Sequence, residues 1–331
     1  MNKAKIAVIG LGYWGPNIVR NLLQISKVSN VYVCDINKYR LNTIKKEYPS
    51  VISLDSPSEV FTNKEIDAVI IATPIKTHYT LAKKSIVSKK HVLIEKPMTT
   101  SVKESEDLIA LAEKYKKIIM VGHTFIYSET VKKIKQIVTK KNFGKIYYLD
   151  STRINLGLIQ KDSNVIWDLA PHDLSIIRYL IPEKPISIQA FASKFIGDKY
   201  ELSHILIRFK NNISAHINIS WVSPVKVRSI IIAGSKKMIF WNDIEPSEKL
   251  KIYDKGIITT SITPFSPAYR SGDVLIPKIG QKEALNTELN HFVDCIINNK
   301  TPLTSGKEGL EIVSLMEIIE KSLISHKEIT L

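Results

Sequence analysis

Residues 5–15 read KIAVIGLGYWG, a short apolar run that leads directly into three glycines with the spacing G-x-G-x-x-G. The run predicts a strand, and the sequence from Gly15 to Ser26 predicts a helix. In this context Gly10 allows a tight turn, Gly12 lets a pyrophosphate approach the backbone, and Gly15 lets the helix pack on the strand. The glycine spacing alone is weak evidence, but a strand before it and a helix after it make it specific. The stretch therefore predicts the first turn of a dinucleotide-binding fold.

Strand-like and helix-like segments alternate along the first 122 residues. Strands are expected at 5–9, 31–35, 51–53, 68–72, 91–94 and 118–121, and helices at 15–26, 38–48, 78–88 and 101–116. Residues 68–72, with the sequence AVIIA, have the continuous apolar character of a strand that is buried on both faces. This alternation predicts a parallel, doubly wound sheet and a first domain over residues 1–122.

The pattern changes after Gly122. From Ile213 to Trp221 apolar and polar residues alternate, which is typical of a half-exposed antiparallel strand, and Asn211-Asn212 before it suit a hairpin turn. Further strands are expected at 145–154, 186–195, 201–209, 227–233 and 238–241, and helices at 128–140, 284–298 and 307–325. We therefore expect a second domain over residues 123–331.

The composition excludes several classes of protein. A length of 331 residues, with 44% hydrophobic and 24% charged residues, is typical of a globular protein of about two domains. The net charge of +15 raises the possibility of nucleic-acid binding. However, forty Lys and only seven Arg are spread along the chain, and no basic block is interleaved with aromatic residues. We expect no nucleic-acid partner. The lysines are either a solvated surface or a field that attracts an anionic substrate.

A membrane span, a metal site and a disulfide framework are also not expected. No apolar run approaches the ~20 residues that a membrane span requires, and no Cys and His residues have the spacing of metal ligands. Cys34 and Cys295 are too few for a disulfide framework. The simplest location is therefore a reducing cytoplasm.

Asp35 ends the second expected strand, twenty residues beyond Gly15. A carboxylate at this position can accept hydrogen bonds from both ribose hydroxyls, and it would repel a 2′-phosphate. It favours NAD over NADP as the cofactor. The alternative is that Asp35 only begins a turn.

Residues with catalytic chemistry follow other strands. Glu95 and Lys96 follow the strand at 91–94, and Thr73-Pro74 follow the strand at 68–72, with His78 close behind. Carboxyl ends of parallel strands are where ligands bind in such sheets.

In the second domain, Asp168 and His172 are four residues apart, on one face of a helix that Asn164 could cap. The oxidation of an alcohol needs a group that takes the hydroxyl proton and a cation that stabilises the developing alkoxide. His172 and Lys96, with Asp168 beside His172, fit that requirement.

These motifs together resemble the Gfo/Idh/MocA family of oxidoreductases. The resemblance rests on the loop Gly10–Gly15, Thr73-Pro74 with His78, Glu95-Lys96-Pro97, Gly122-His123, Asp168 with His172, and the closing stretch Pro302–Gly306. It implies an N-terminal Rossmann domain and a C-terminal α+β domain with a large, mostly antiparallel open sheet. It also implies a homodimer or homotetramer that forms through the exposed face of that sheet.

Within the family, the chain looks most like the nucleotide-sugar 3-dehydrogenases, which act on UDP-N-acetylglucosamine or its uronate ahead of transamination. The resemblance implies that Lys96 binds the reacting oxygen and the ribose, that His172 accepts the proton, and that Asp168 orients His172 or binds a neighbouring hydroxyl. The implied cofactor contacts are Gly10, Gly12, Tyr13, Trp14, Gly15, Asp35, Thr73, Pro74, His78, Glu95 and Lys96. The implied substrate contacts are Lys96, His123, Arg153, Asn155, Asp168 and His172.

Other interpretations stay open. A dehydrogenase of inositol or another free polyol would share Lys96, Asp168 and His172, and a regulator that binds NAD(P) without turnover would share the fold. His78 and His123 are equally interpretable as structural loop histidines, and Trp167 as a core residue.

Overall fold

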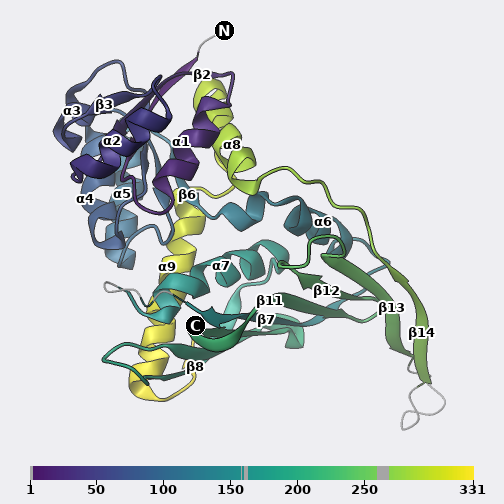
Figure 1. Ribbon diagram of the computed structural model, residues 1–331. Helices are drawn as coiled ribbons and strands as arrows, with labels where there is room; N and C mark the ends of the chain where they lie inside the picture. Colours follow the sequence, from purple (N-terminus) through teal and green to yellow (C-terminus); the bar gives the residue numbers. More distant parts are fainter. Residues whose placement is uncertain (1–2, 158, 160–162, 259–267) are drawn as a thin grey trace. The chain divides into compact units, whose positions relative to one another are not determined.

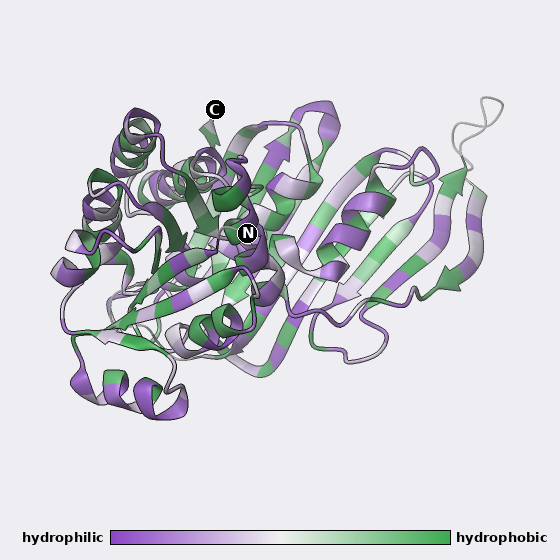
Figure 2. Ribbon diagram, turned by 90° about the horizontal axis from the view of Figure 1, so that it is seen from above, coloured by the Kyte–Doolittle hydropathy of each residue, from purple (hydrophilic) through white to green (hydrophobic). Residues whose placement is uncertain are grey.

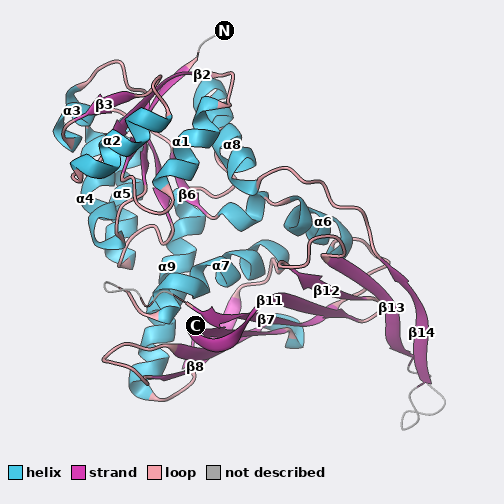
Figure 3. Cartoon of the chain, in the orientation of Figure 1, coloured by secondary structure: helices cyan, strands magenta, loops and turns pink. Residues whose placement is uncertain are grey.

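The computed structural model describes residues 3–157, 159, 163–258 and 268–331. The chain forms two compact units, and each unit is made of two segments (Figures 1 and 3). The first contains residues 1–127 and 282–314, and the second contains residues 128–281 and 315–331. These units are discontinuous in sequence, whereas the expected domains, 1–122 and 123–331, are continuous. The division at residue 122 into a cofactor-binding domain and a substrate-binding domain stays a prediction.

The first unit contains a six-stranded sheet in which all paired strands are parallel. Its strands, in the spatial order β3-β2-β1-β4-β5-β6, are Ile52–Leu54, Val28–Cys34, Ala4–Ile9, Ala68–Ile71, His91–Glu95 and Ile119–Gly122. The connecting helices are α1 (Gly15–Leu23), α2 (Lys38–Glu47), α3 (Pro57–Thr62), α4 (His78–Val87) and α5 (Val102–Tyr115). The predicted doubly wound sheet is confirmed. Its strand order reverses between β1 and β4, which is where such sheets open a crevice for ligands.

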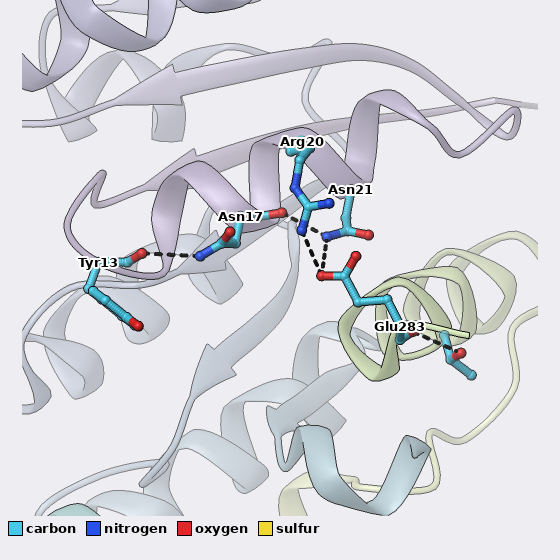
Figure 4. A network of polar contacts seen from close by, with 6 residues as sticks. Tyr13, Asn17, Arg20, Asn21 and Glu283 are labelled. Atoms are coloured by element: carbon cyan, nitrogen blue, oxygen red, sulfur yellow. Dashed lines mark hydrogen bonds and ion pairs between the residues drawn. The ribbon is translucent and has the colours of Figure 1, made fainter. Parts of the chain in front are cut away.

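The segment 282–314 completes the first unit with α8 (Ala284–Asn298) and the beginning of α9 (Gly306–Ser325). Figure 4 shows how α8 is attached to α1. Glu283, directly before α8, accepts hydrogen bonds from Arg20 (2.7 Å) and Asn21 (3.0 Å). Between α8 and α9, the Thr304 carbonyl oxygen accepts a hydrogen bond from the Val121 N–H (2.8 Å). The segment is therefore fixed both to α1 and to the edge strand β6.

The second unit contains a mixed, mostly antiparallel sheet of nine strands, which confirms the expected open sheet. In the order β14-β13-β12-β11-β7-β10-β9-β8-β15 they are Ala268–Leu275, Leu250–Ile258, Met238–Asn242, Val222–Gly234, Ile146–Leu156, Ser214–Ser220, Leu202–Phe209, Pro185–Ser193 and Ile329–Thr330. Among the described strands of this sheet, β7 and β10 are the one parallel pair. The unit also contains the helices α6 (Glu129–Val138) and α7 (Val165–Leu180) and the part of α9 from Leu315 onward. Asn211 and Asn212 both adopt left-handed backbone angles (φ 62° and 57°), as a turn between β9 and β10 requires.

A buried ion pair attaches α7 to one face of this sheet. Asp173 of α7 accepts hydrogen bonds from the Ser151 hydroxyl (2.8 Å) and from Nε and Nη2 of Arg153 (2.8 and 3.1 Å), both on β7. All three side chains are buried. Along the strands, buried and exposed residues alternate, and the hydropathy of successive residues alternates with them (Figure 2). The sheet therefore has one face under α7 and one open face.

Among the described residues, no helix is long and apolar enough to cross a membrane.

Candidate active site

The first unit gathers most of the expected cofactor residues at one edge of its sheet. Gly10 follows β1, Asp35 follows β2, Thr73 follows β4, Glu95 ends β5 and His123 follows β6. Because the strands are parallel, their carboxyl ends meet at the same edge.

The surroundings of Gly10, Gly12 and Gly15 differ, so a side chain would be excluded at two of these positions and tolerated at the third. Gly10 has a φ of +98°, and a Cβ there would lie 2.5 Å from the Ala72 carbonyl oxygen. A Cβ on Gly15 would lie 2.3 Å from the Gly10 carbonyl oxygen. A Cβ on Gly12 would meet only the Arg40 guanidinium, at 3.9 Å. Packing thus requires Gly10 and Gly15, whereas the surface over Gly12 is open.

The helix after this loop begins without a side-chain cap. Trp14 occupies the N-cap position and makes no capping hydrogen bond with its side chain. The first N–H groups of a nine-residue helix are thereby left for another acceptor. Tyr13 and Trp14 beside them are exposed and contact each other edge to face, with ring centroids 5.6 Å apart. The open surface at Gly12 and the uncapped helix start fit the pyrophosphate of a dinucleotide.

Asp35 is buried (6% exposed) and has a structural role that the sequence did not reveal. Its Oδ2 accepts a hydrogen bond from the Leu11 N–H (2.6 Å), and its Oδ1 accepts one from the Asn37 N–H (2.7 Å). The carboxylate therefore ties the glycine loop to the end of β2. Each oxygen keeps a second acceptor site, so ribose hydroxyls can still donate to it.

His78 connects two loops of the same edge. Its Nδ1 lies 2.9 Å from the Pro97 carbonyl oxygen, and its Nε2 lies 2.8 Å from the Thr73 carbonyl oxygen. Burial lowers the pKa of His78, although both carbonyls oppose this shift. The uncharged ring donates to one carbonyl and holds the loop at Thr73-Pro74 close to the loop that follows Lys96. This supports the structural interpretation of His78, and a direct cofactor contact stays a prediction.

Behind the end of β5 lie two acids and a histidine. Burial raises the pKa of Glu95 to about 7, although Lys96 opposes this shift. Glu288 of α8 is 1% exposed, and its pKa is raised well above the ordinary value, first by burial and then by Glu95. His123 is 2% exposed, and neither ring nitrogen has a hydrogen-bond partner among the described residues. Burial, with Lys96 adding to it, lowers the pKa of His123 to about 4. Sequence reasoning missed Glu288 entirely.

The second unit places Asp168 and His172 one turn apart on α7, and both are partly exposed. Asn164 caps this helix as expected, since its side chain accepts hydrogen bonds from the N–H groups of Ile166 (3.0 Å) and Trp167 (3.1 Å). The residue that fixes Asp168 was not expected. The indole Nε1 of the buried Trp221 donates a hydrogen bond to Asp168 Oδ2 (3.1 Å).

Trp167 and the two expected sugar contacts also lie in the second unit. The indole of Trp167 donates a hydrogen bond to Glu320 (2.5 Å). Arg153 is buried, with its guanidinium directed at Asp173 of the ion pair described above, and Asn155 is partly exposed. Their contact with a substrate stays a prediction. Among the residues that the structure describes, no cluster of His, Cys, Asp or Glu could hold a metal ion.

Two family models match the chain. Residues 4–123 match the NAD-binding Rossmann fold of the GFO/IDH/MocA oxidoreductase family, and residues 131–240 match a GFO/IDH/MocA C-terminal domain. A UDP-N-acetylglucosamine 3-dehydrogenase of Acidithiobacillus ferrooxidans is 27% identical over 94% of each chain. The myo-inositol 2-dehydrogenase of Thermotoga maritima is 23% identical, over 99% of this chain and 98% of that enzyme.

Solved structures show the same fold. A structure of the UDP-N-acetylglucosamine 3-dehydrogenase of A. ferrooxidans aligns with a TM-score of 0.81 at 22% identity, over 98% of this chain and 99% of that chain. The structure of GenD2 from gentamicin A biosynthesis, in complex with NAD, aligns with a TM-score of 0.84 at 16% identity, over 100% of this chain and 97% of that chain.

The glycine geometry generates a prediction that separates binding from folding. Gly12→Ala should leave the thermal midpoint nearly unchanged but weaken NAD binding by about tenfold or more, because the methyl group displaces a charged phosphate from a backbone hydrogen bond. Gly10→Ala should instead lower the thermal midpoint, since its Cβ overlaps the Ala72 carbonyl. Calorimetric titration with NAD and thermal unfolding measure the two effects. Unchanged NAD affinity in Gly12→Ala would contradict the assignment of this loop.

Proposed function

Because the chain belongs to the Gfo/Idh/MocA oxidoreductase family, we propose that it is an NAD-dependent dehydrogenase that oxidises C3 of a nucleotide-activated sugar. The proposed substrate is UDP-N-acetylglucosamine or its uronate. The observation that carries the proposal is the set of strand-end residues around Lys96 in an NAD-binding domain, together with the Asp168–His172 pair on α7.

The proposed chemistry assigns one task to each side chain. NAD, when bound, supplies the acceptor for the hydride that leaves C3. His172 takes the hydroxyl proton, and the Lys96 ammonium stabilises the negative charge that develops on the oxygen. Asp168, one turn before His172, orients the imidazole and stabilises its charged form. The Trp221 indole, in turn, holds the Asp168 carboxylate in place.

Two observations support a nucleotide sugar as the substrate. The relative that acts on UDP-N-acetylglucosamine aligns over nearly the whole chain. The net charge of +15 would attract a diphosphate but would give no advantage with a neutral polyol. The product, a 3-keto sugar, is suited to transamination, which agrees with a role in amino-sugar or surface-polysaccharide synthesis. Both cysteines are buried and neither forms a disulfide, which is consistent with the cytoplasm.

The second candidate is the oxidation of a free cyclic polyol. It is favoured by the inositol dehydrogenase that aligns over 99% of the chain. The catalytic residues would be the same, and only the substrate contacts would differ.

A substrate panel tests the two candidates. The protein is incubated with NAD and, in separate reactions, UDP-N-acetylglucosamine, its uronate, UDP-glucose, myo-inositol and scyllo-inositol, and reduced cofactor is measured by absorbance. We expect turnover with a UDP-N-acetyl sugar, observed once an aminotransferase removes the unfavourable 3-keto product. Turnover with inositol alone would establish the second candidate. Binding of NAD without turnover of any member would favour a regulator.

The catalytic assignment predicts the effect of two substitutions. His172→Ala and Lys96→Ala should each lower the turnover number by about a hundredfold or more, which is the range of general acid–base contributions. Lys103→Ala and His326→Ala, at exposed positions, are matched controls that should keep full activity. Circular dichroism shows whether each variant is folded. If His172→Ala keeps most of its turnover, the proton goes elsewhere, and Lys96 becomes the next candidate.

We also propose that the open face of the nine-stranded sheet binds a second copy of the chain. The chain has forty lysines. On the strands β8, β9, β10, β7, β11 and β12, all of which are described, none of the outward residues that pair in register is a lysine. One row across this face consists of Gln189, Leu206, His216, Asp150, Ile231 and Phe240. A surface with no lysine at its register-paired positions and with exposed apolar side chains such as Leu206 and Ile231 suits a self-complementary interface.

Oligomeric state provides the test. Light scattering after size exclusion should show a dimer or tetramer for the wild type. The double variant Leu206→Lys/Ile231→Lys should be monomeric, because it places charges in the middle of an interface that buries roughly 800 Å² per partner. Ile324→Lys, on an exposed position of α9, should leave the assembly intact. A monomeric wild type at micromolar concentration would contradict the proposal.

A further inference from the structure

The guanidinium of Arg40 lies over the glycine loop of the first unit. Arg40 is the third residue of α2, the helix that follows β2 and Asp35. Its Nη1 lies 3.9 Å from the position that a Cβ on Gly12 would occupy. The side chain therefore reaches from α2 to the surface at which the pyrophosphate of a dinucleotide would approach the backbone.

No contact within the described part of the protein accounts for this position of the guanidinium. Arg40 is exposed, and its side chain forms no hydrogen bond or ion pair with the residues that the structure describes. The neighbouring acid, Asp35, directs its two carboxylate oxygens to the backbone N–H groups of Leu11 (2.6 Å) and Asn37 (2.7 Å). The positive charge of Arg40 can therefore bind a ligand.

The other polar groups in the first turn of α2 already have partners. Lys38, two residues before Arg40, forms an exposed ion pair with Asp55. The side chain of Asn37 accepts hydrogen bonds from the backbone N–H groups of Tyr39 (3.0 Å) and Arg40 (3.3 Å). These bonds fix the backbone of the turn and leave the Arg40 guanidinium as the group that can reach an anion at Gly12.

The start of α1, on the other side of Gly12, offers fewer donors than most helices do. Pro16 is the second residue of α1 and has no backbone N–H. An anion at this helix start therefore meets one backbone donor fewer than usual. A guanidinium has five N–H donors in a planar fork that matches the oxygens of a phosphate group. Arg40 can supply the missing donor and adds a full positive charge.

We propose that Arg40 binds the pyrophosphate of the dinucleotide and is a cofactor-binding residue outside the G-x-G-x-x-G motif. The pyrophosphate is then held by the backbone of the glycine loop and by a cation from α2. This inference rests on the proposed function in one respect, the binding of NAD, and it is independent of the sugar that is oxidised. A cation after β2 can alternatively serve the 2′-phosphate of NADP, and the experiment below distinguishes these two roles.

Calorimetric titration with NAD tests the proposal. Arg40→Gln should raise the Kd for NAD about tenfold, because a charge-assisted hydrogen bond to phosphate is lost. The Kd for NADP should rise by the same factor, since both cofactors contain the pyrophosphate. Lys38→Gln is the matched control: it removes the same charge from the same turn, but from a side chain that is paired with Asp55. Its Kd for NAD should stay within about twofold of the wild-type value.

Two further measurements separate binding from folding and charge from packing. Without cofactor, Arg40→Gln should unfold at the wild-type midpoint, because the guanidinium has no partner among the described residues. The rise of this midpoint on addition of NAD should be smaller in the variant. Added NaCl should weaken NAD binding by the wild type more than by Arg40→Gln, since salt screens the attraction between guanidinium and phosphate.

A double-mutant cycle tests whether Arg40 and Gly12 act on the same phosphates. The losses of NAD affinity in Gly12→Ala and Arg40→Gln should be less than additive in the double variant, because each substitution disturbs the same group. Fully additive losses would assign the two residues to different parts of the cofactor and overturn the inference.

The remaining failures are distinguishable. If Arg40→Gln weakens NADP binding but leaves the Kd for NAD unchanged, Arg40 acts on the 2′-phosphate and the inference is wrong. If salt affects NAD binding equally in Arg40→Gln and in the wild type, the charge of Arg40 is not used and the inference is also wrong. In both cases the wild type binds NAD, so the proposed function stands. If the wild type does not bind NAD, the inference and the proposed function both fail.

Discussion

The close approach of two backbone segments at the centre of the parallel sheet is the constraint on which the candidate cofactor site depends. The turn after β1 passes so near to the end of β4 that a Cβ on Gly10 would lie 2.5 Å from the Ala72 carbonyl oxygen. Gly15 packs equally closely against Gly10, so α1 begins directly over this turn. The helix start therefore faces the crevice at which the strand order reverses, and the other strand ends meet along the same edge.

In the second unit, a buried ion pair positions the helix that carries Asp168 and His172. The buried contact of Asp173 with Arg153 and Ser151 fixes α7 on the sheet. A buried ion pair often adds little net stability, because desolvation offsets the attraction, but it restricts the helix to one register on the strand. Trp221 then holds Asp168 from the sheet side. The helix that presents Asp168 and His172 is thus positioned by polar contacts as well as by apolar packing.

Much of this fold could be predicted from the sequence because buried strands and amphipathic helices leave a local pattern. The six parallel strands, the hairpin at Asn211-Asn212 and the helix at 284–298 were all expected. Two of the elements that were missed, α3 and β14, lack such a pattern. The helix α3 has only six residues, and β14 is exposed along almost its whole length, so its pairing with β13 depends on backbone hydrogen bonds that any sequence can form. The return of 282–314 to the first unit is a tertiary contact without a local signal.

The same distinction applies to the candidate site. Glycine spacing and strand-end residues are local, so the sequence indicated Gly12, Asp35 and Lys96. The contacts that hold them are not local: Asp35 reaches Leu11 across 24 residues, and Thr124 reaches Glu288 across 164. A glutamate on an amphipathic helix is ordinarily a solvated charge. Glu288, however, lies three residues after Leu285 and four before Phe292, on the apolar face of α8, and this spacing is the signal in the sequence that indicates its burial. A buried acid without a cation lowers stability unless its proton stays on. With forty lysines in the chain, a cationic partner would have been easy to supply. Burial, and after it the charge of Glu95, raises the pKa of Glu288, so the acid remains protonated and its burial is tolerated.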